Sequence, residues 1–189
     1  VIDAYQYPPL LWADNAHNHV YKYNIFGQII DVNNLGAKQV EIFHFWNAGD
    51  VTIQYNDFNS YAIDTPNTRR RLMPTVDIPI SSDIFIQGDP SPPTPNPTFN
   101  IQYNNFYDHN HVLDIIELHN YHFNITANNN YYAEMNKMDN ISTQMYDGCG
   151  SSTSSTGYVI FWPIYVQPVD FTNPTSPILP IECYWDNVI

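Results

Sequence analysis

The amino-acid sequence predicts a mainly β fold: an antiparallel β-sandwich with one short helix. Three observations lead to this prediction. Hydrophobic residues make up 43% of the 189 residues and aromatic residues 15%, which indicates one domain with a proper core rather than a disordered chain. Proline (15) outnumbers glycine (7), and tyrosine (15) is abundant, which suits short strands joined by polar turns. Closely spaced turn signals separate roughly nine or ten short apolar runs, as is typical of a sandwich.

The first half of the chain predicts a β-hairpin. Residues 38–46 (KQVEIFHFW) alternate in side-chain character, and so do the apolar residues within 50–57 (DVTIQYND). The turn signal Asn47-Ala-Gly-Asp50 lies between the two runs. We therefore expect them to pair as neighbouring antiparallel strands.

Proline positions define a surface loop after the next predicted strand, residues 83–87. The segment 89–98 (DPSPPTPNPT) carries five prolines, a spacing that no sheet interior or helix tolerates. Because another apolar run, residues 99–106, follows directly, we interpret the loop as internal to one domain of residues 1–189 and not as a domain boundary.

The second half predicts further strands and the one helix. The helix is expected over residues 131–138, after the possible caps Asn129 and Asn130. A flexible loop is expected over residues 147–157 (DGCGSSTSSTG). The expected strands cover residues 111–125, 158–167 and 178–185.

Two short sequences recur. IQYNDF at residues 53–58 returns as IQYNNF at 101–106, and HNHV occurs at 17–20 and again at 109–112. A duplication would keep both pairs in the same order, but HNHV precedes IQYN in the first half and follows it in the second. We interpret the repeats as compositional.

The charge of the chain excludes several partners. A formal net charge of -13 and a pI near 4.5 repel the phosphate backbone, so nucleic acid is not an expected partner. Anionic membrane surfaces are disfavoured for the same reason, and no apolar run reaches the roughly 18 residues that a membrane-spanning helix needs. Membrane insertion is therefore not expected.

Lysine is scarce, with only Lys22, Lys38 and Lys137 in a chain that has 23 asparagines. Two explanations fit: exposure to a trypsin-like protease, or an acidic extracellular surface kept soluble by self-repulsion. Both place the protein outside a cytoplasm. The start, Val1-Ile-Asp-Ala, lacks the features of a signal peptide and suggests a chain cut from a longer precursor.

The histidines are the candidates for metal chemistry. His109 and His111, with Asp114 and Glu117 downstream, match the His-x-His-plus-carboxylate pattern of metal sites on β-barrels. However, the glycine-rich approach and the third histidine of such sites are not recognisable. We therefore predict no metal, and we keep a metal-dependent enzyme as an alternative.

Other catalytic signals are missing. The sequence has no G-x-S-x-G elbow, no phosphate loop and no HExxH, so neither catalytic residues nor a cofactor are predicted. Scattered carboxylates leave a glycosidase pair open. Cys149 and Cys183 form either one bridge or two free buried thiols.

The two ends of the chain resemble a known family. The opening VIDAYQYPP (residues 1–9), the aromatic FWPIY (161–165) and the late ECY (182–184) are similar to the lectin-like head of the rotavirus outer-capsid spike, in a divergent group. The resemblance implies a galectin-like sandwich that binds cell-surface glycans. It also implies a position on the virion surface, attachment to the remainder of the spike protein, and release by trypsin.

The run Arg69-Arg70-Arg71 supplies half of the six Lys and Arg residues. On an acidic protein, such a patch is suited to the carboxylate or sulfate of an anionic sugar. Alternatively, the run is a tryptic site, or it pairs with Asp64 and Asp77.

A sugar site also needs an exposed aromatic ring. Trp46 precedes a turn, where its ring can stay partly exposed, and His44 lies on the same strand face. The alternative is that Trp46 belongs to the core. We therefore predict ligand binding by His44, Trp46, Arg69 and Arg70.

The sequence thus predicts a non-enzymatic viral attachment domain that binds a host glycan or another receptor. The first alternative is a structural subunit of a coat or extracellular filament. The second alternative is the metal-dependent enzyme built on His109 and His111.

Overall fold

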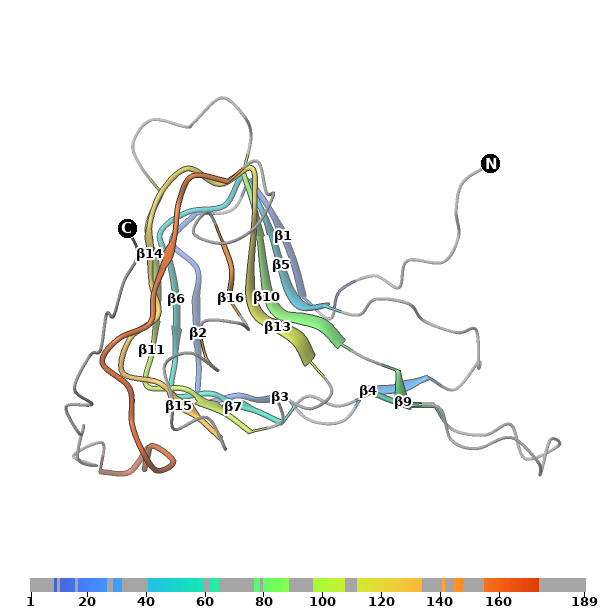
Figure 1. The fold of residues 1–189 in the computed structure, drawn as a ribbon, viewed down its shortest axis with the longest axis vertical. Coiled ribbons are helices and arrows are strands. Elements are labelled where there is room, and N and C mark those ends of the chain that lie inside the picture. The colour runs from blue at the N-terminus through green and yellow to red at the C-terminus, as the bar shows by residue number, and fades with distance from the viewer. Residues whose placement is uncertain are drawn as a thin grey trace, which may run out of the picture.

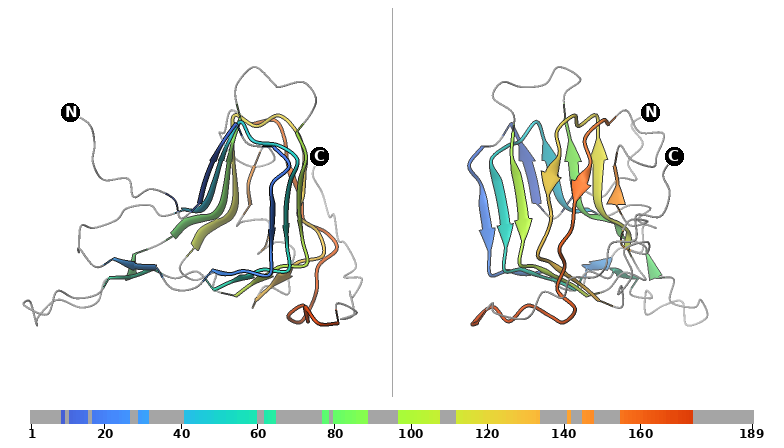
Figure 2. Two further views of the ribbon diagram at one scale, coloured as in Figure 1. Left: turned by 180° about the vertical axis from the view of Figure 1, so that it is seen from behind. Right: turned by 60° about the vertical axis from the view of Figure 1, so that its left-hand side comes forward.

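The chain is wound into a parallel β-helix, which Figure 1 views along the stack of coils. The computed structural model describes residues 9, 11–15, 17–26, 29–31, 41–59, 62–64, 77–78, 80–88, 97–107, 112–133, 141, 145–147 and 155–173. Within them, three sheets form the sides of the helix. Within each of these sheets, the strands run in the same direction, as Figure 2 shows.

Each sheet collects one strand from successive coils. Sheet 1 contains β1 (Leu11–Asp14), β5 (Glu41–Trp46), β10 (Ile80–Gln87), β13 (Val112–His119) and β16 (Met145–Tyr146). Sheet 2 contains β2 (Val20–Lys22), β6 (Val51–Gln54), β11 (Phe99–Gln102), β14 (Ile125–Thr126) and β17 (Val159–Ile160). Sheet 3 contains β3 (Ile25–Phe26), β7 (Asp57–Phe58), β12 (Asn105–Phe106) and β15 (Tyr131–Tyr132).

The strands define five coils in chain order. Coil 1 is β1–β2–β3, coil 2 is β5–β6–β7, coil 3 is β10–β11–β12 and coil 4 is β13–β14–β15. Coil 5 has β16 and β17, and its Tyr165 forms a parallel bridge with Tyr131 of coil 4. A small separate sheet holds β4 (Ile29–Asp31), β8 (Ala62–Asp64) and β9 (Asp77–Ile78).

The prediction of an antiparallel sandwich is wrong, although the mainly β content is confirmed. Every strand pair of sheets 1–3 is parallel, and the one antiparallel pair among the described residues is β8 with β9. The hairpin is wrong too. β5 and β6 follow each other in sequence but lie in different sheets, because β5 pairs with β1 and β10, its equivalents in the neighbouring coils.

The helix predicted over residues 131–138 is also wrong for the residues that the structure describes. Tyr131 and Tyr132 form strand β15, and residues 134–138 lie outside the described residues. Ile141 is the only described residue with helical structure. No helix in the described part of the chain has the length and apolar character needed to cross a membrane. The proline-rich segment 89–96, the cysteines and residues 178–185 are likewise outside the described residues.

The recurrence of IQYN is structural, not compositional. Ile53 pairs with Ile101, and the Tyr55 N–H donates to the Tyr103 carbonyl at 3.1 Å, so the two copies lie directly above one another in coils 2 and 3. The HNHV pair has no such relation. His17 precedes β2 of sheet 2, whereas the second copy runs into β13 of sheet 1.

The core is filled by columns of like side chains, as a parallel register requires. The clearest column stacks one aromatic ring from each strand of sheet 3. Ring centroids are 5.0 Å apart for Phe26–Phe58, 4.7 Å for Phe58–Phe106 and 5.2 Å for Phe106–Tyr132. All four residues are buried, so the column anchors sheet 3 against the other two sheets.

A ladder of asparagines forms the corner between sheets 2 and 3. In each rung, a side-chain Oδ1 accepts a hydrogen bond from the backbone N–H of the asparagine in the coil before it. The bonds are Asn24 N–H to Asn56 Oδ1 at 2.9 Å, Asn56 N–H to Asn104 Oδ1 at 3.0 Å and Asn104 N–H to Asn130 Oδ1 at 2.8 Å. Asn56, Asn104 and Asn130 are fully buried. The residue before each rung has a positive φ of 57° to 59°, an unusual backbone that turns the chain from one sheet to the next; these residues are Tyr23, Tyr55, Tyr103 and Asn129.

Buried tyrosines should make the fold sensitive to alkali. Burial raises the pKa of Tyr132 and of Tyr121 above their ordinary value. The unfolded chain therefore releases these protons more readily, so their stabilising contribution is complete below about pH 10 and is lost as the pH rises further. We expect the melting temperature to fall above pH 10, and to fall less steeply in Tyr132→Phe than in the exposed control Tyr158→Phe. Equal slopes would contradict this.

Candidate functional site

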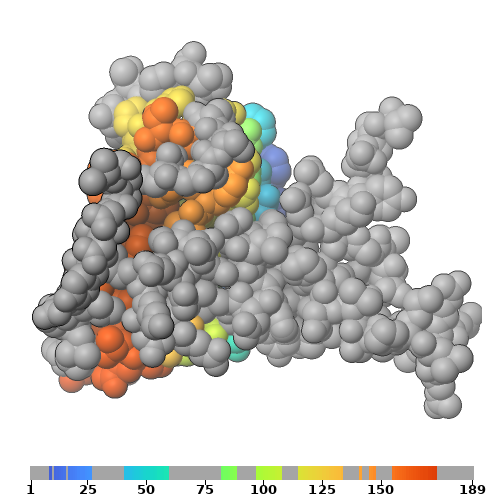
Figure 3. All heavy atoms as spheres, viewed as in Figure 1, coloured from blue at the N-terminus to red at the C-terminus, as the bar shows by residue number. Residues whose placement is uncertain are grey.

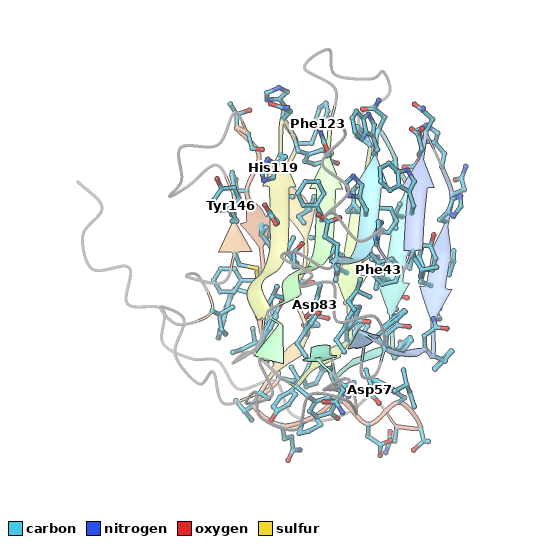
Figure 4. The ribbon with its side chains drawn as sticks, turned by 90° about the vertical axis from the view of Figure 1, so that its right-hand side faces the viewer. Phe43, Asp57, Asp83, His119, Phe123 and Tyr146 are labelled. Atoms are coloured by element: carbon cyan, nitrogen blue, oxygen red, sulfur yellow. The ribbon has the colours of Figure 1, made fainter. Side chains whose placement is uncertain are left out.

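Five rings form a continuous column on the outer face of sheet 1, one from each strand. Trp12 stacks on His44 with centroids 4.4 Å apart and planes 2° apart. Phe85 lies 4.6 Å from His44, His119 lies 4.9 Å from Phe85, and Tyr146 lies 5.4 Å from His119. Figure 4 faces this sheet and shows His119 and Tyr146 side by side. We call these five residues the ring column.

The ring column follows from strand alternation and parallel register. Trp12 pairs with His44, and His44 with Phe85, so their side chains leave the sheet on the same side, one above the other. The direct partner of Phe85 in β13 is Glu117, and the ring of His119, two residues further, completes the column.

Both histidines of the column are held by carboxylates. The Nδ1 of His44 lies 2.6 Å from Glu41 Oε2, and the Nε2 of His119 lies 2.6 Å from Glu117 Oε1. The Nε2 of His44 is buried without a hydrogen-bond partner. Such an atom is uncommon in a core, and this one lies directly beneath the exposed end of the ring column.

Trp12 is the exposed end of the ring column. A ring within the column has column neighbours on both faces, but Trp12 has one, His44, on one face alone among the described residues, and the residue is 56% exposed. Trp46, at the end of β5, is 39% exposed, and its ring lies 6.5 Å from that of Trp12. Together the two indoles form an open aromatic platform.

Polar groups border the platform. Asp14 follows Trp12 by two residues on β1 and is exposed, and its Oδ1 accepts a hydrogen bond from Asn15 Nδ2 at 2.7 Å. The Asn15 N–H donates to the Trp46 carbonyl at 2.8 Å, which ties the two tryptophan-bearing strands together where sheet 1 ends. A planar amide and a carboxylate thus lie beside two exposed rings.

Toward the N-terminal ends of its strands, the outer face of sheet 1 is buried. Ile42, Asp83 and Ile115 are outward positions of β5, β10 and β13, yet all three are buried. The charged groups described near the exposed part of this face are Asp14, Glu41 and Glu117. His44 and His119 of the ring column lie between them. This surface therefore suits an uncharged ligand better than an anionic one.

The structure brings together two of the four predicted site residues. His44 and Trp46 share the outer face of β5; Trp46 is exposed rather than part of the core, and His44 is largely buried under Trp12. Arg69 and Arg70 lie outside the described residues, as do His109 and His111. Among the described residues, no group of three or more His, Cys, Asp or Glu is placed to hold a metal ion.

Trp12 is the residue that the sequence analysis missed. The signal was present in LWAD (residues 11–14), a short apolar run that carries a tryptophan, as the end of β5 does. It points to the site only once β1 is known to lie beside β5 in parallel.

Comparisons with protein-family models, with curated proteins and with solved structures found no match for this chain. The resemblance to the rotavirus spike head stays a prediction. The galectin-like sandwich that it implies is wrong for this chain, because sheets 1–3 form a parallel β-helix.

Proposed function

We propose that this chain is a non-enzymatic carbohydrate-binding domain of an attachment protein, and that the glycan binds at the Trp12–Trp46 platform. The observation that carries the proposal is the position of Trp12, an exposed indole that ends the ring column beside a second exposed indole. Sugars offer apolar C–H faces and many hydroxyl groups, so they bind where an open aromatic ring lies beside planar hydrogen-bonding groups.

The ring column supports this function by holding the platform rigid. Trp12 rests on His44, which is fixed by Glu41 on one side and by Phe85 on the other. A fixed ring loses little conformational freedom when a ligand binds, so more of the contact energy appears as affinity.

The proposed ligand is a neutral glycan. Asp14 and Glu41 lie near the platform, and their charges would repel a sialylated or sulfated sugar. This differs from the anionic sugar expected at the arginine run. The acidic, lysine-poor composition is compatible with display on a virion or another extracellular surface, which we include in the proposal.

Truncating the platform should remove glycan binding and leave the fold intact. We expect Trp12→Ala to weaken binding of neutral oligosaccharides, first identified on an array of neutral, sialylated and sulfated glycans, by at least about tenfold in titration calorimetry, because a stacked aromatic contact is lost. The melting temperature should change little, since Trp12 is an exposed edge residue. Tyr158→Ala, which removes an exposed ring from coil 5, should bind normally.

Two results would count against this assignment. One is normal binding by both Trp12→Ala and Trp46→Ala. The other is a hit restricted to sialylated or sulfated glycans that Arg70→Ala abolishes, which would move the site to the arginine run.

A further inference from the structure

Coil 1 carries the most exposed apolar side chains described in the molecule. Besides Trp12, these are Val20 at 62%, Tyr23 at 65% and Ile25 at 77% exposed. The register partners of Val20 and Ile25 in coil 2 are Thr52 and Asp57, both polar. Apolar residues thus replace polar ones where the stack of coils ends.

The strands of coil 1 are also open along one edge. Among the described strands, β2 and β3 each pair on one side only, with β6 and β7, so no described strand pairs with the main-chain groups on their other edge. The asparagine ladder is open at the same place. Every later rung accepts the backbone N–H of the coil before it, whereas no described residue donates a hydrogen bond to the Oδ1 of Asn24. An open strand edge readily pairs with another strand.

Coil 5, which lies nearest the viewer in Figure 3, does not provide the matching end. The ladder position there is Ile164, which has no side-chain amide and is buried. The residue before it, Pro163, has no N–H to donate, unlike the tyrosines at this position in coils 1–3. A second copy stacked from coil 5 onto coil 1 would therefore lack both the ladder hydrogen bond and this main-chain donor.

The charge of the open edge favours a copy of the same chain. Residues 20–26 (VYKYNIF) contain one lysine and no carboxylate in a chain of net charge -13. Two such acidic molecules approach each other with least repulsion where both surfaces lack carboxylates. The exposed side chains of Val20, Tyr23 and Ile25 would then be covered on both molecules at once.

We propose that coil 1 is the interface of a symmetric dimer, in which β2 pairs antiparallel with β2 of a second copy. A two-fold axis at Tyr21 places Val20 opposite Lys22 of the second copy on the outer face of sheet 2, where the alkyl stem of lysine can cover the valine. Such a contact is self-complementary and closed, so association stops at the dimer. This inference does not depend on the proposed glycan site.

Sedimentation velocity over a concentration series tests the dimer. The full chain should shift from monomer to dimer and no further. Val20→Lys places a second lysine directly opposite Lys22 of the second copy, twice in the dimer, and should raise the dimer dissociation constant by at least about tenfold. Ile160→Lys is the matched control: it makes the same change of net charge in the same outward row of sheet 2, but in coil 5, and should dimerise normally.

The result is interpretable in each case. If Val20→Lys lowers the melting temperature, Ile25→Glu on β3 provides a second test of the same interface. A chain that stays monomeric at the highest concentration overturns the proposal. Oligomers beyond the dimer that both Val20→Lys and Ile160→Lys dissolve would overturn it in favour of head-to-tail stacking.

Discussion

Asn104→Ala is expected to lower the free energy of unfolding by about 3–5 kcal/mol, because it leaves several buried polar groups without partners. The Asn104 side chain makes five hydrogen bonds. It accepts from the backbone N–H of Asn56 at 3.0 Å and donates to the carbonyl of Ile53 at 2.9 Å, and neither group is reached by water in this corner. Denaturant unfolding followed by circular dichroism measures the loss.

Asn24→Ala is the matched control for this prediction. It removes the same side chain from the same ladder, but Asn24 is the exposed first rung, and its Nδ2 bonds only to Lys22 and Asn56. We expect a loss of at most about 1 kcal/mol, because water replaces the lost partners. Equal losses for the two variants would show that burial of the ladder is not what stabilises the corner.

Phe58→Ala is expected to cost about 3–5 kcal/mol through the cavity that it opens in the core. Phe58 lies between Phe26 and Phe106 in the sheet 3 column, with centroids at 5.0 and 4.7 Å, and its ring also approaches Phe43 of sheet 1 at 6.0 Å. Removing the ring therefore weakens contacts along the stack and across it. The midpoint of thermal or denaturant unfolding gives the size of the effect.

Tyr55→Ala is the control, since it removes a stacked ring from the outside of the same coil. Tyr55 lies between Tyr23 and Tyr103 at 5.2 and 5.4 Å, but its column is partly solvent-exposed. We expect a loss of no more than about 1.5 kcal/mol, the usual value of an aromatic contact. A loss as large as that of Phe58→Ala would mean that outer stacking, not the filled core, governs stability.

Much of the strand content was predictable from alternation. Residues 38–46, 50–57 and 99–106 contain β5, β6 and β11–β12, and alternate residues such as Phe43, Ile53 and Ile101 face the core. Alternation determines which side chains are buried, but not which strand lies next to which. Alternation therefore could not predict whether neighbouring strands pair in parallel or antiparallel.

The evidence for a parallel fold was present in the sequence but uneven. The IQYN repeat marks the corner of coils 2 and 3, because Tyr55 and Tyr103 turn the chain and the asparagine after each fills the ladder. Coil 1 keeps only YN at this point and coil 4 has NN, so the repeat is weak. The HNHV pair does not occupy equivalent positions in the coils, and its different order led us to interpret the IQYN repeat as compositional.

The candidate site was half predictable for a similar reason. His44 and Trp46 are neighbours on one strand, and sequence periodicity finds such pairs. Trp12 reaches them only through the pairing of β1 with β5, a contact between residues far apart in sequence. Sites built across coils are hidden until the register is known.

The uneven spacing of the asparagine ladder has a consequence for how this protein can diversify. Successive rungs are 32, 48 and 26 residues apart, yet each meets the next within hydrogen-bond distance. The extra residues are accommodated outside the rungs, and β4, β8 and β9 of the small sheet all lie in the chain between sheet 3 and the next strand of sheet 1. Insertions at this corner can therefore lengthen, shorten or change composition without altering the scaffold. A protein under pressure to alter its outer surface could vary these segments freely while the ladder keeps the coils in register.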